Sequence, residues 1–305
     1  MTIDNNVKSI FFLNYIILFS AIVLSVYYAH NLFVELNEKY AYKNLLTINS
    51  LAVKNVETHL QYVSTSVESL GKSYKKLYSQ KNKHLNSPST YQYKAIKNDK
   101  ITFYNTSIIK EDYLFQSDHA SIILSNLNQN SETITKELNI FHHLSPALES
   151  IYNSFNFSWI YFTTANNFLL IYPYVPFINA SEAYKPTEQH FYNAANFTNK
   201  SVGWEEPYYD LVGGGILVTA SYPVYDDSDN LLGVASHDIT LDKMQEYVLD
   251  ATSVYEGSVS FLISKHGKVI SSSDKLYQSE VEEQSAHKYR GNFYYRTLEN
   301  SKKIA

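Results

Sequence analysis

The chain has 305 residues, a net charge of −5 at pH 7 and no cysteine. An acidic balance argues against a nucleic-acid partner, because proteins that bind nucleic acid present basic faces to the phosphate backbone. The lack of cysteine excludes disulfide bonds, thiolate metal sites and cysteine nucleophiles. The 28 tyrosines and 16 phenylalanines supply apolar surface for a large core and aromatic surface for ligand contact.

An apolar run without a charged side chain occupies residues 10–29. It is long enough for a helix to cross about 30 Å of hydrocarbon. The run passes directly into a polar helical pattern rather than into a small-residue cleavage site, so we expect an uncleaved signal anchor and keep a cleavable signal peptide as the alternative. Lys8 is the basic residue on the short N-terminal side, which places that end in the cytoplasm and residues from about 31 onward outside.

The segment after this run predicts a long helix, because apolar residues recur alternately three and four positions apart. They are Val53, Val56, Leu60, Val63, Val67, Leu70, Tyr74 and Leu77. An unbroken helix over residues 31–78 would extend about 70 Å at 1.5 Å per residue. We expect the apolar stripe to pack on the sheet of its own domain. A coiled coil between two copies is the alternative, and both can hold on different stretches.

Residues 79–131 are polar and irregular, and no element is assigned to them. Helical spacing of apolar residues predicts a second helix over residues 132–153, which we expect Pro146 to break or bend. His142 and His143 lie within it and suggest a metal site. Adjacent helical residues point about 100° apart and no carboxylate lies at helical spacing, so the metal site is rejected.

Two hairpins are predicted next. Residues 158–163 and 168–173 are rich in aromatic and β-branched residues and are joined by a short turn, and the confident strands of the second hairpin cover residues 216–224 and 231–237. The residues before the second hairpin, GWEEPYYD from Gly203, are interpreted as a loop. Beyond it, Thr240 as a cap and Asp242 in the first turn predict a helix to about residue 251.

The turn of the second hairpin, at residues 226–230, resembles a calcium-binding loop because aspartates alternate in it. The sixth place of that loop must be glycine, whereas this chain has Leu232 there, and most of the intervening ligands are missing. A hairpin turn rich in Asp and Asn explains the same residues and is the favoured interpretation.

Strand patterns restart at residues 258–264 and 269–271, which indicates a second, related subdomain. The chain then reaches residue 305 without a return strand, a second apolar span or an output domain. We therefore expect a fragment of a longer protein.

The order of these features resembles the double Cache (tandem PAS-like) sensor domains found outside the membrane in bacterial histidine kinases, chemotaxis receptors and cyclic-dinucleotide enzymes. The sequence stretches that carry the resemblance are a hairpin ending in Tyr-Pro, FYNAA, GWEEPYYD, TASYPVYD and GVASHDIT. The resemblance covers residues 31–305 and is most specific over 159–239.

The resemblance implies an α+β fold, in which a long N-terminal helix precedes a PAS-like antiparallel sheet domain. The expected organisation, in chain order, is a cytoplasmic N-terminus at 1–9, a membrane anchor at 10–29, a long stalk or packing helix at 30–78, a membrane-distal Cache subdomain at 79–251, and the incomplete start of a membrane-proximal subdomain at 252–305.

Family members that bind amino acids or amines carry a pocket pattern of Tyr, Arg five residues later, Trp-Tyr, a further Tyr and a final Asp. Here Gln189 stands where arginine is expected and Phe191 stands where tryptophan is expected. The resemblance, with one tyrosine added from the first hairpin, implies a ligand site formed by Tyr161, Tyr184, Gln189, Phe191, Tyr192, Tyr208 and Asp238.

In that pattern the aspartate accepts hydrogen bonds from a ligand ammonium group, the arginine clamps a ligand carboxylate, and the aromatic residues surround both. Replacing arginine by Gln189 should weaken binding of a free α-carboxylate by roughly tenfold or more, unless Lys185 or His190 substitutes for it. We therefore expect an amine without a standard carboxylate, or an uncharged polar ligand. The alternatives are that Asp238 only bonds backbone amides and that the aromatic residues are core.

These features predict the small-molecule sensing region of a bacterial transmembrane receptor. The expected setting is the inner membrane with a single N-terminal span, a periplasmic or extracellular sensor, and a homodimer without a cofactor. The alternative is a ligand-free Cache module that dimerises or binds another exported protein. A membrane-anchored hydrolase is third, because the chain lacks nucleophile and zinc motifs and its nearest carboxylate pair is Glu205 and Glu206 in a predicted loop. We therefore expect no enzymatic activity in this chain. Its sequence does not indicate the type of output domain.

Overall fold

One continuous helix, α1 (Asn5–Ser79), begins the computed structural model and confirms the long helix predicted as far as residue 78. The structure describes residues 5–80, 93–97, 102–106, 120–125, 129–155, 158–175, 184–210, 216–240, 242–244, 246, 259–263 and 269–274. The chain divides into two compact units, Met1–Val53 and Lys54–Ala305, which are considered separately.

The first unit consists of the N-terminal part of α1. By length and composition this helix could cross a membrane, and none of its most apolar window is buried. Its large apolar side chains are exposed, including Phe19 and Leu24. A helix that is apolar on all sides and unburied in protein is typical of a membrane span.

The second unit is built on an eight-stranded antiparallel sheet in the order β1-β2-β3-β5-β4-β8-β7-β6. The strands are β1 (Tyr93–Lys97), β2 (Thr102–Thr106), β3 (Ser121–Leu124), β4 (Trp159–Thr164), β5 (Phe168–Tyr172), β6 (Gly203–Tyr209), β7 (Ile216–Tyr225) and β8 (Leu231–Thr240). Both predicted hairpins are confirmed as β4–β5 and β7–β8, and β4 and β8 pair with each other at the centre. The α+β class is confirmed.

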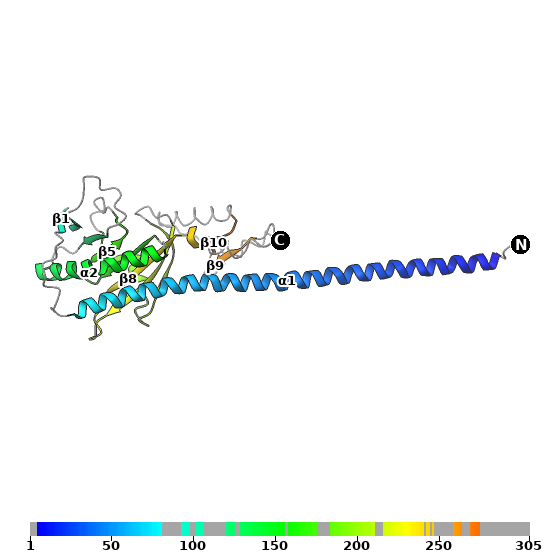
Figure 1. The fold of residues 1–305 in the computed structure, drawn as a ribbon, viewed down its shortest axis with the longest axis horizontal. Helices are drawn as coiled ribbons and strands as arrows, with labels where there is room; N and C mark the ends of the chain where they lie inside the picture. The colour runs from blue at the N-terminus through cyan, green and yellow to red at the C-terminus, as the bar shows by residue number, and fades with distance from the viewer. Residues whose placement is uncertain are drawn as a thin grey trace. The chain divides into compact units, whose positions relative to one another are not determined.

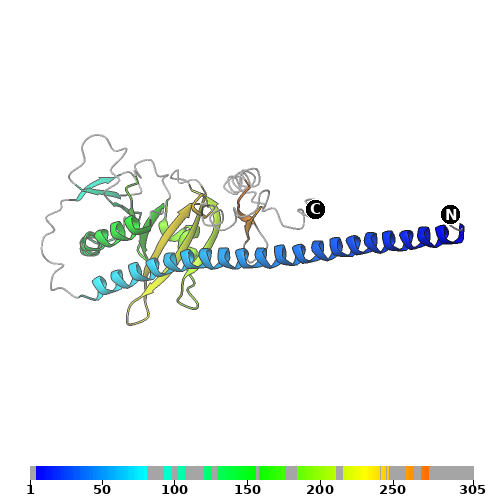
Figure 2. The same cartoon turned by 45° about the vertical axis from the view of Figure 1, so that its right-hand side comes forward.

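Helix α2 (Ser131–Phe155) and the later part of α1 lie over the same face of this sheet (Figures 1 and 2). Val63, Val67, Leu70 and Tyr74 of α1 are fully buried there, and Tyr74 stacks on Phe162 of β4 with ring centroids 3.8 Å apart. The predicted packing of the α1 stripe on its own sheet is therefore confirmed for this stretch. Burying each such side chain contributes about 1.5–3 kcal/mol.

Gly71 lets α1 approach β7 closely. A Cβ atom at this position would lie 2.7 Å from Cγ2 of Val224 and 2.9 Å from Cδ1 of Tyr222. Real Cβ atoms essentially never come that close. The absence of a side chain at Gly71 therefore sets how tightly the helix can sit on the β7–β8 hairpin.

The break in the helix, which was one of the two alternatives expected at Pro146, is wrong, and so is the loop expected from Gly203. Helix α2 continues through Pro146 instead of breaking there, because its buried stripe, which includes Phe141, Leu144 and Leu148, packs on the sheet on both sides of the proline. The stretch interpreted as a loop from Gly203 is strand β6, which pairs with β7 and has an irregularity between Glu205 and Tyr208.

The remaining elements are short. η2 (Pro186–Glu188) precedes α3 (His190–Asn193), and Phe191 and Tyr192 of α3 belong to a smaller apolar cluster with residues of β4, β5 and β8 such as Tyr161, Leu169 and Val234. Strands β9 (Phe261–Ile263) and β10 (Val269–Ser272) form a separate antiparallel pair, where the restarted strand pattern was predicted. Thr240 caps the turn after β8 by accepting a hydrogen bond from Lys243 N at 3.3 Å, as predicted, and the end of the expected helix lies outside the described residues.

Candidate functional site

The candidate site forms on the sheet face opposite α1, where alternate residues of three adjacent strands meet. Asp238 of β8 lies opposite Trp159 of β4 on one side and Thr219 of β7 on the other. Because side chains alternate between the faces of a strand, Tyr161 points to the same face as the Asp238 carboxylate. The two side chains meet there, since the Tyr161 hydroxyl donates to Asp238 Oδ1 at 2.9 Å.

Thr219 and Tyr208 extend this contact into a chain of hydroxyls. Thr219 Oγ1 donates to Asp238 Oδ1 at 2.6 Å and lies 2.8 Å from the Tyr208 hydroxyl. A hydroxyl has only one hydrogen, and that of Thr219 is directed to Asp238, so Tyr208 must donate to Thr219. Asp238 is 4% exposed, and the site is thus a buried carboxylate that accepts from hydroxyl groups.

Burial raises the pKa of Asp238 to about 7, although hydrogen bonds from Thr219 and Tyr161 oppose the change. The negative charge of Asp210 raises the same pKa. Burial, followed by the charge of Asp238, also raises the pKa of both Tyr161 and Tyr208 well above the ordinary value, so both phenols remain donors. A carboxylate in this environment gains more from a neighbouring cation than an exposed one, because water does not already stabilise its charge.

Aromatic rings surround the hydroxyl chain. The Phe191 ring meets Tyr161 edge-on with centroids 5.1 Å apart, and the His190 ring lies 4.0 Å from that of Tyr208. The main chain of α3 is held to the sheet, since Ser221 Oγ donates to the Phe191 carbonyl oxygen at 2.7 Å. Aromatic faces beside a carboxylate are favourable surroundings for an ammonium group.

Of the expected site residues, the structure brings together Tyr161, Phe191, Tyr208 and Asp238. Tyr184 packs at the margin of the same apolar cluster. Tyr192 is also in the cluster but faces Phe197, with ring centroids 6.0 Å apart, and burial raises its pKa to about 12.

Gln189 uses its side chain within its own turn. Its Nε2 donates to the Lys185 carbonyl oxygen at 3.0 Å, and Lys185 Nζ is paired with Glu188 at 2.6 Å. Both side chains therefore have local partners. Of Lys185 and His190, the two residues that could substitute for the missing arginine, it is His190 that contacts another site residue, Tyr208.

Sequence reasoning missed Thr219 and Asp210. Thr219 follows Tyr208 by eleven positions and reaches Asp238 only because β6, β7 and β8 are neighbours in the sheet. Asp210 follows Tyr208 by two positions and lies one residue beyond the end of β6, and this period-two spacing from Tyr208 is the signal that could have identified it.

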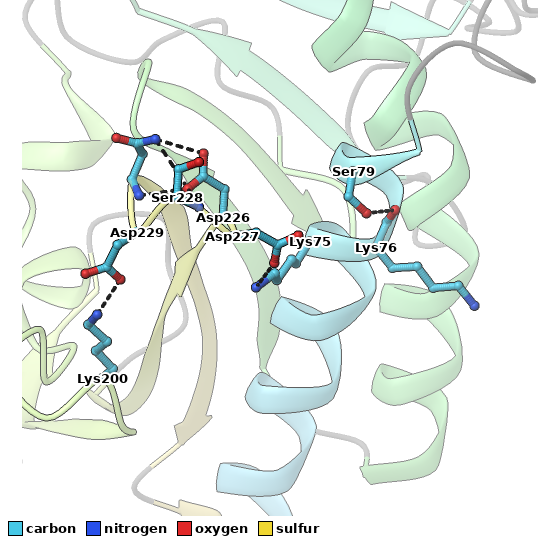
Figure 3. Close-up of polar contacts among 9 residues, drawn as sticks. Lys75, Lys76, Ser79, Lys200, Asp226, Asp227, Ser228 and Asp229 are labelled. Carbon is cyan, nitrogen blue, oxygen red and sulfur yellow. Dashed lines mark hydrogen bonds and ion pairs between the residues drawn. The ribbon is translucent and has the colours of Figure 1, made fainter.

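The acidic residues 226–230 form the turn of the β7–β8 hairpin, as predicted, and lie far along the hairpin from Asp238. Asp226 Oδ1 accepts from the backbone amides of Ser228 and Asn230 at 2.9 and 2.8 Å. Asp227 pairs with Lys75, and Asp229 with Lys200 (Figure 3). Among the residues that the structure describes, no group of three or more His, Asp or Glu side chains is placed to hold a metal ion.

Comparison with known proteins identifies the part of the chain that carries this site. Residues 120–246 match the family model of the first PDC sensor domain of methyl-accepting chemotaxis protein-like receptors. A curated relative, the methyl-accepting chemotaxis protein McpC of Bacillus subtilis, is 36% identical over 110 residues. The alignment covers 36% of this chain and 16% of that protein.

Two solved structures are among those similar to this chain. The ligand-binding domain of the Pseudomonas aeruginosa amino acid chemoreceptor PctC in complex with GABA has 20% sequence identity and a TM-score of 0.45, covering 75% of this chain and 74% of that one. The sensory domain of the Campylobacter jejuni chemoreceptor Tlp3 with isoleucine bound has 16% identity and a TM-score of 0.48, covering 77% and 72%. Over residues 120–246, which include β4, β7 and β8, the chain matches a chemoreceptor-type sensor domain, and the predicted resemblance to extracytoplasmic Cache sensors is confirmed.

Proposed function

We infer that this chain is the ligand-sensing region of a transmembrane chemoreceptor and that Asp238 binds the ammonium group of an amine-bearing small molecule. The observation that carries this proposal is the buried Asp238 carboxylate, which accepts from Tyr161 and Thr219 and has aromatic rings nearby. A bound ammonium group would neutralise Asp238 at the place where burial makes its charge costly, which is a source of affinity.

The ligand class follows from the charges around Asp238. Asp210 adds a second negative charge close enough to raise the pKa of Asp238, which favours a cation and disfavours an anion. Gln189 replaces the arginine that would clamp a carboxylate, and its amide bonds a backbone carbonyl in its own turn. An amine without an α-carboxylate is therefore the proposed ligand, rather than a plain α-amino acid.

The proposed arrangement in the cell places residues 10–29 in the bacterial inner membrane and the sheet domain outside it. The apolar, exposed N-terminal part of α1 and the chemoreceptor family match of residues 120–246 support this topology. The proposed domain order is the anchor, the long helix, a membrane-distal subdomain at 79–251 and the start of a second subdomain at 252–305, with receptor dimers as the working unit.

The test compares two amino acids with the amines that their decarboxylation would give, using the full chain in lipid nanodiscs. Agmatine is paired with L-arginine, and 2-methylbutylamine with L-isoleucine, and thermal unfolding is followed with each. We expect at least one amine to raise the melting temperature more than its amino acid. At one hundred times Kd, the expected stabilisation is about 2.7 kcal/mol.

Asp238→Asn is the test variant and Asp229→Asn the matched control, because Asp229 lies in an exposed turn with its partner Lys200. The amine effect should disappear in Asp238→Asn and persist in Asp229→Asn. Greater stabilisation by the amino acids than by their amines would contradict the proposed ligand class. No stabilisation by any of the four compounds would contradict ligand binding at this site.

A ligand-free module is the second candidate, and one observation favours it. Asp238 Oδ1 already accepts two hydrogen bonds from the protein's own hydroxyls, which is what a purely structural carboxylate would do. Under this alternative, all four compounds leave the melting temperature unchanged, and Asp238→Asn changes stability alone.

A further inference from the structure

We propose that the β7–β8 hairpin couples the Asp238 site to helix α1, with the hydrogen bond between His237 and Ser66 as the principal link. This inference rests on the proposed function, because it concerns what happens when a ligand occupies the site. His237 and Ser66 lie outside the site and transmit the effect of ligand binding to the helix.

The hairpin has one face toward the site and the other toward α1. Asp238 and Thr219 face the site, whereas their chain neighbours His237 and Ala220 lie on the opposite face. His237 is fully buried. Any displacement of β8 that accompanies binding at Asp238 therefore moves His237 as well, because the two residues share one peptide unit.

His237 reaches α1 through Ser66. The Ser66 Oγ atom lies 2.7 Å from His237 Nδ1 and also donates to the Val63 carbonyl oxygen at 2.7 Å. Both contacts are satisfied together only when Nδ1 carries the ring hydrogen and donates to Ser66, because the serine hydroxyl has one hydrogen. Burial lowers the pKa of His237 to about 3, so the ring is neutral at physiological pH and this tautomer is available.

Two further contacts fasten α1 to the same hairpin. Gly71 allows the helix to rest directly against Tyr222 and Val224 of β7. Lys75 pairs with Asp227 in the hairpin turn at 2.8 Å (Figure 3). The exposed ion pair contributes little energy, so the buried Ser66–His237 bond and the close packing at Gly71 are the contacts that resist sliding.

Helix α1 has a second buried polar contact, and it leads to a different element. The Tyr74 hydroxyl donates to Glu137 of α2 at 2.8 Å. The helix is thus bonded to the hairpin near Ser66 and to α2 near Tyr74. A hairpin displacement should therefore change the distance between the Ser66 region of α1 and α2, provided that the Ser66–His237 bond is intact.

The absence of native cysteine allows this distance to be measured with spin labels on the full chain. Gln61→Cys on α1 and Ser150→Cys on α2 place the labels at exposed positions of the two helices. Pulsed electron paramagnetic resonance in nanodiscs gives the distance with and without agmatine, and the melting temperature of each sample reports binding separately. Helix shifts in allosteric transitions are about 1–2 Å.

Ser66→Ala is the test variant and Ser73→Ala its matched control, because Ser73 bonds only within its own helix, donating to the Ser69 carbonyl oxygen. We expect agmatine to raise the melting temperature of all three proteins. The label distance should change in the parent and in Ser73→Ala but stay constant in Ser66→Ala. Ser66→Thr, which keeps a hydroxyl, should restore the change, and His237→Phe is the second disrupting variant if Ser66→Ala does not fold.

The outcomes separate the two proposals. The coupling is overturned if agmatine raises the melting temperature of the parent without changing the label distance. It is also overturned if the label distance in Ser66→Ala changes as it does in the parent. In both cases ligand binding stands. If neither agmatine nor, in its place, 2-methylbutylamine raises the melting temperature of the parent, amine sensing is contradicted and the coupling is overturned with it.

Discussion

Tyr74 of α1 and Glu137 of α2 form a buried hydrogen bond of 2.8 Å, and Glu137 is only 3% exposed. Burial raises the pKa of Glu137 from 4.5 to about 7, although the hydrogen bond from Tyr74 and the charge of Lys136 oppose the change. Lys136 itself lies over the Tyr78 ring, 3.6 Å from its centroid. The contact between the two helices therefore includes a carboxyl group that titrates near neutrality.

We predict that Glu137 makes the domain less stable as pH rises. The folded state holds the Glu137 proton more tightly than the unfolded state, so its favourable contribution is complete below about pH 4.5 and is lost as pH rises to about 7. The total loss is on the order of 3 kcal/mol. Urea unfolding of the parent and of Glu137→Gln between pH 4.5 and 8 measures it.

Glu149→Gln is the matched control, because Glu149 is exposed on the same helix. The difference in unfolding free energy between the parent and Glu137→Gln should vary with pH, whereas that between the parent and Glu149→Gln should not. Parallel profiles for all three proteins would show that Glu137 does not titrate in this window.

Amine binding should strengthen as pH rises through about 7. A cationic ligand binds the ionised form of Asp238, whose pKa is about 7 in the absence of ligand. Below that value, each unit of pH should weaken the affinity for agmatine by up to about tenfold. Isothermal titration calorimetry at pH 6, 7 and 8, in buffers of different ionisation enthalpy, should also detect proton release on binding. Affinity that is independent of pH would argue against a direct contact with Asp238.

Thr219→Val should both destabilise the domain and weaken amine binding. The substitution keeps the shape of the side chain but removes the hydroxyl that donates to Asp238 and accepts from Tyr208. Leaving buried polar groups without partners costs about 1–3 kcal/mol. Thr219→Ser retains the hydroxyl and should preserve affinity. Thermal unfolding and calorimetric titration separate the two effects, and equal affinity of Thr219→Val and the parent would remove Thr219 from the binding machinery.

Gly71→Ala should destabilise the domain even though alanine favours helix by about 1 kcal/mol over glycine. The added methyl group would overlap Val224 and Tyr222, which forces α1 away from β7. We expect a net loss of about 1–3 kcal/mol in the free energy of unfolding. Val224→Ala in the same chain should recover part of the loss, and a double-mutant cycle measures the coupling. Additive effects of the two substitutions would indicate that they do not meet.

The long helices α1 and α2 and the strands of the two hairpins were predictable because their signals are local, whereas β1, β2 and β3 lie in residues 79–131, to which no element was assigned. Apolar residues at helical spacing, such as Val63, Val67 and Leu70, indicated both the helix and the face that it buries. Strand β6 was missed because Gly203 and Pro207 are typical of loops, and its pairing with β7 is a long-range effect. Pro146 was expected to break or bend helix α2, but the helix continues through it because packing of its stripe outweighs the cost of the proline.

The sequence by itself determined the class of domain, the α+β order of elements, and four residues that do meet at the site, Tyr161, Phe191, Tyr208 and Asp238. Only the tertiary structure decided that Thr219 holds Asp238 and that His237 binds Ser66, which precedes it by 171 positions. The alternation of a strand tells which of its residues share a face. Which strand or helix lies beside that face depends on the packing of the whole sheet, which no local pattern encodes.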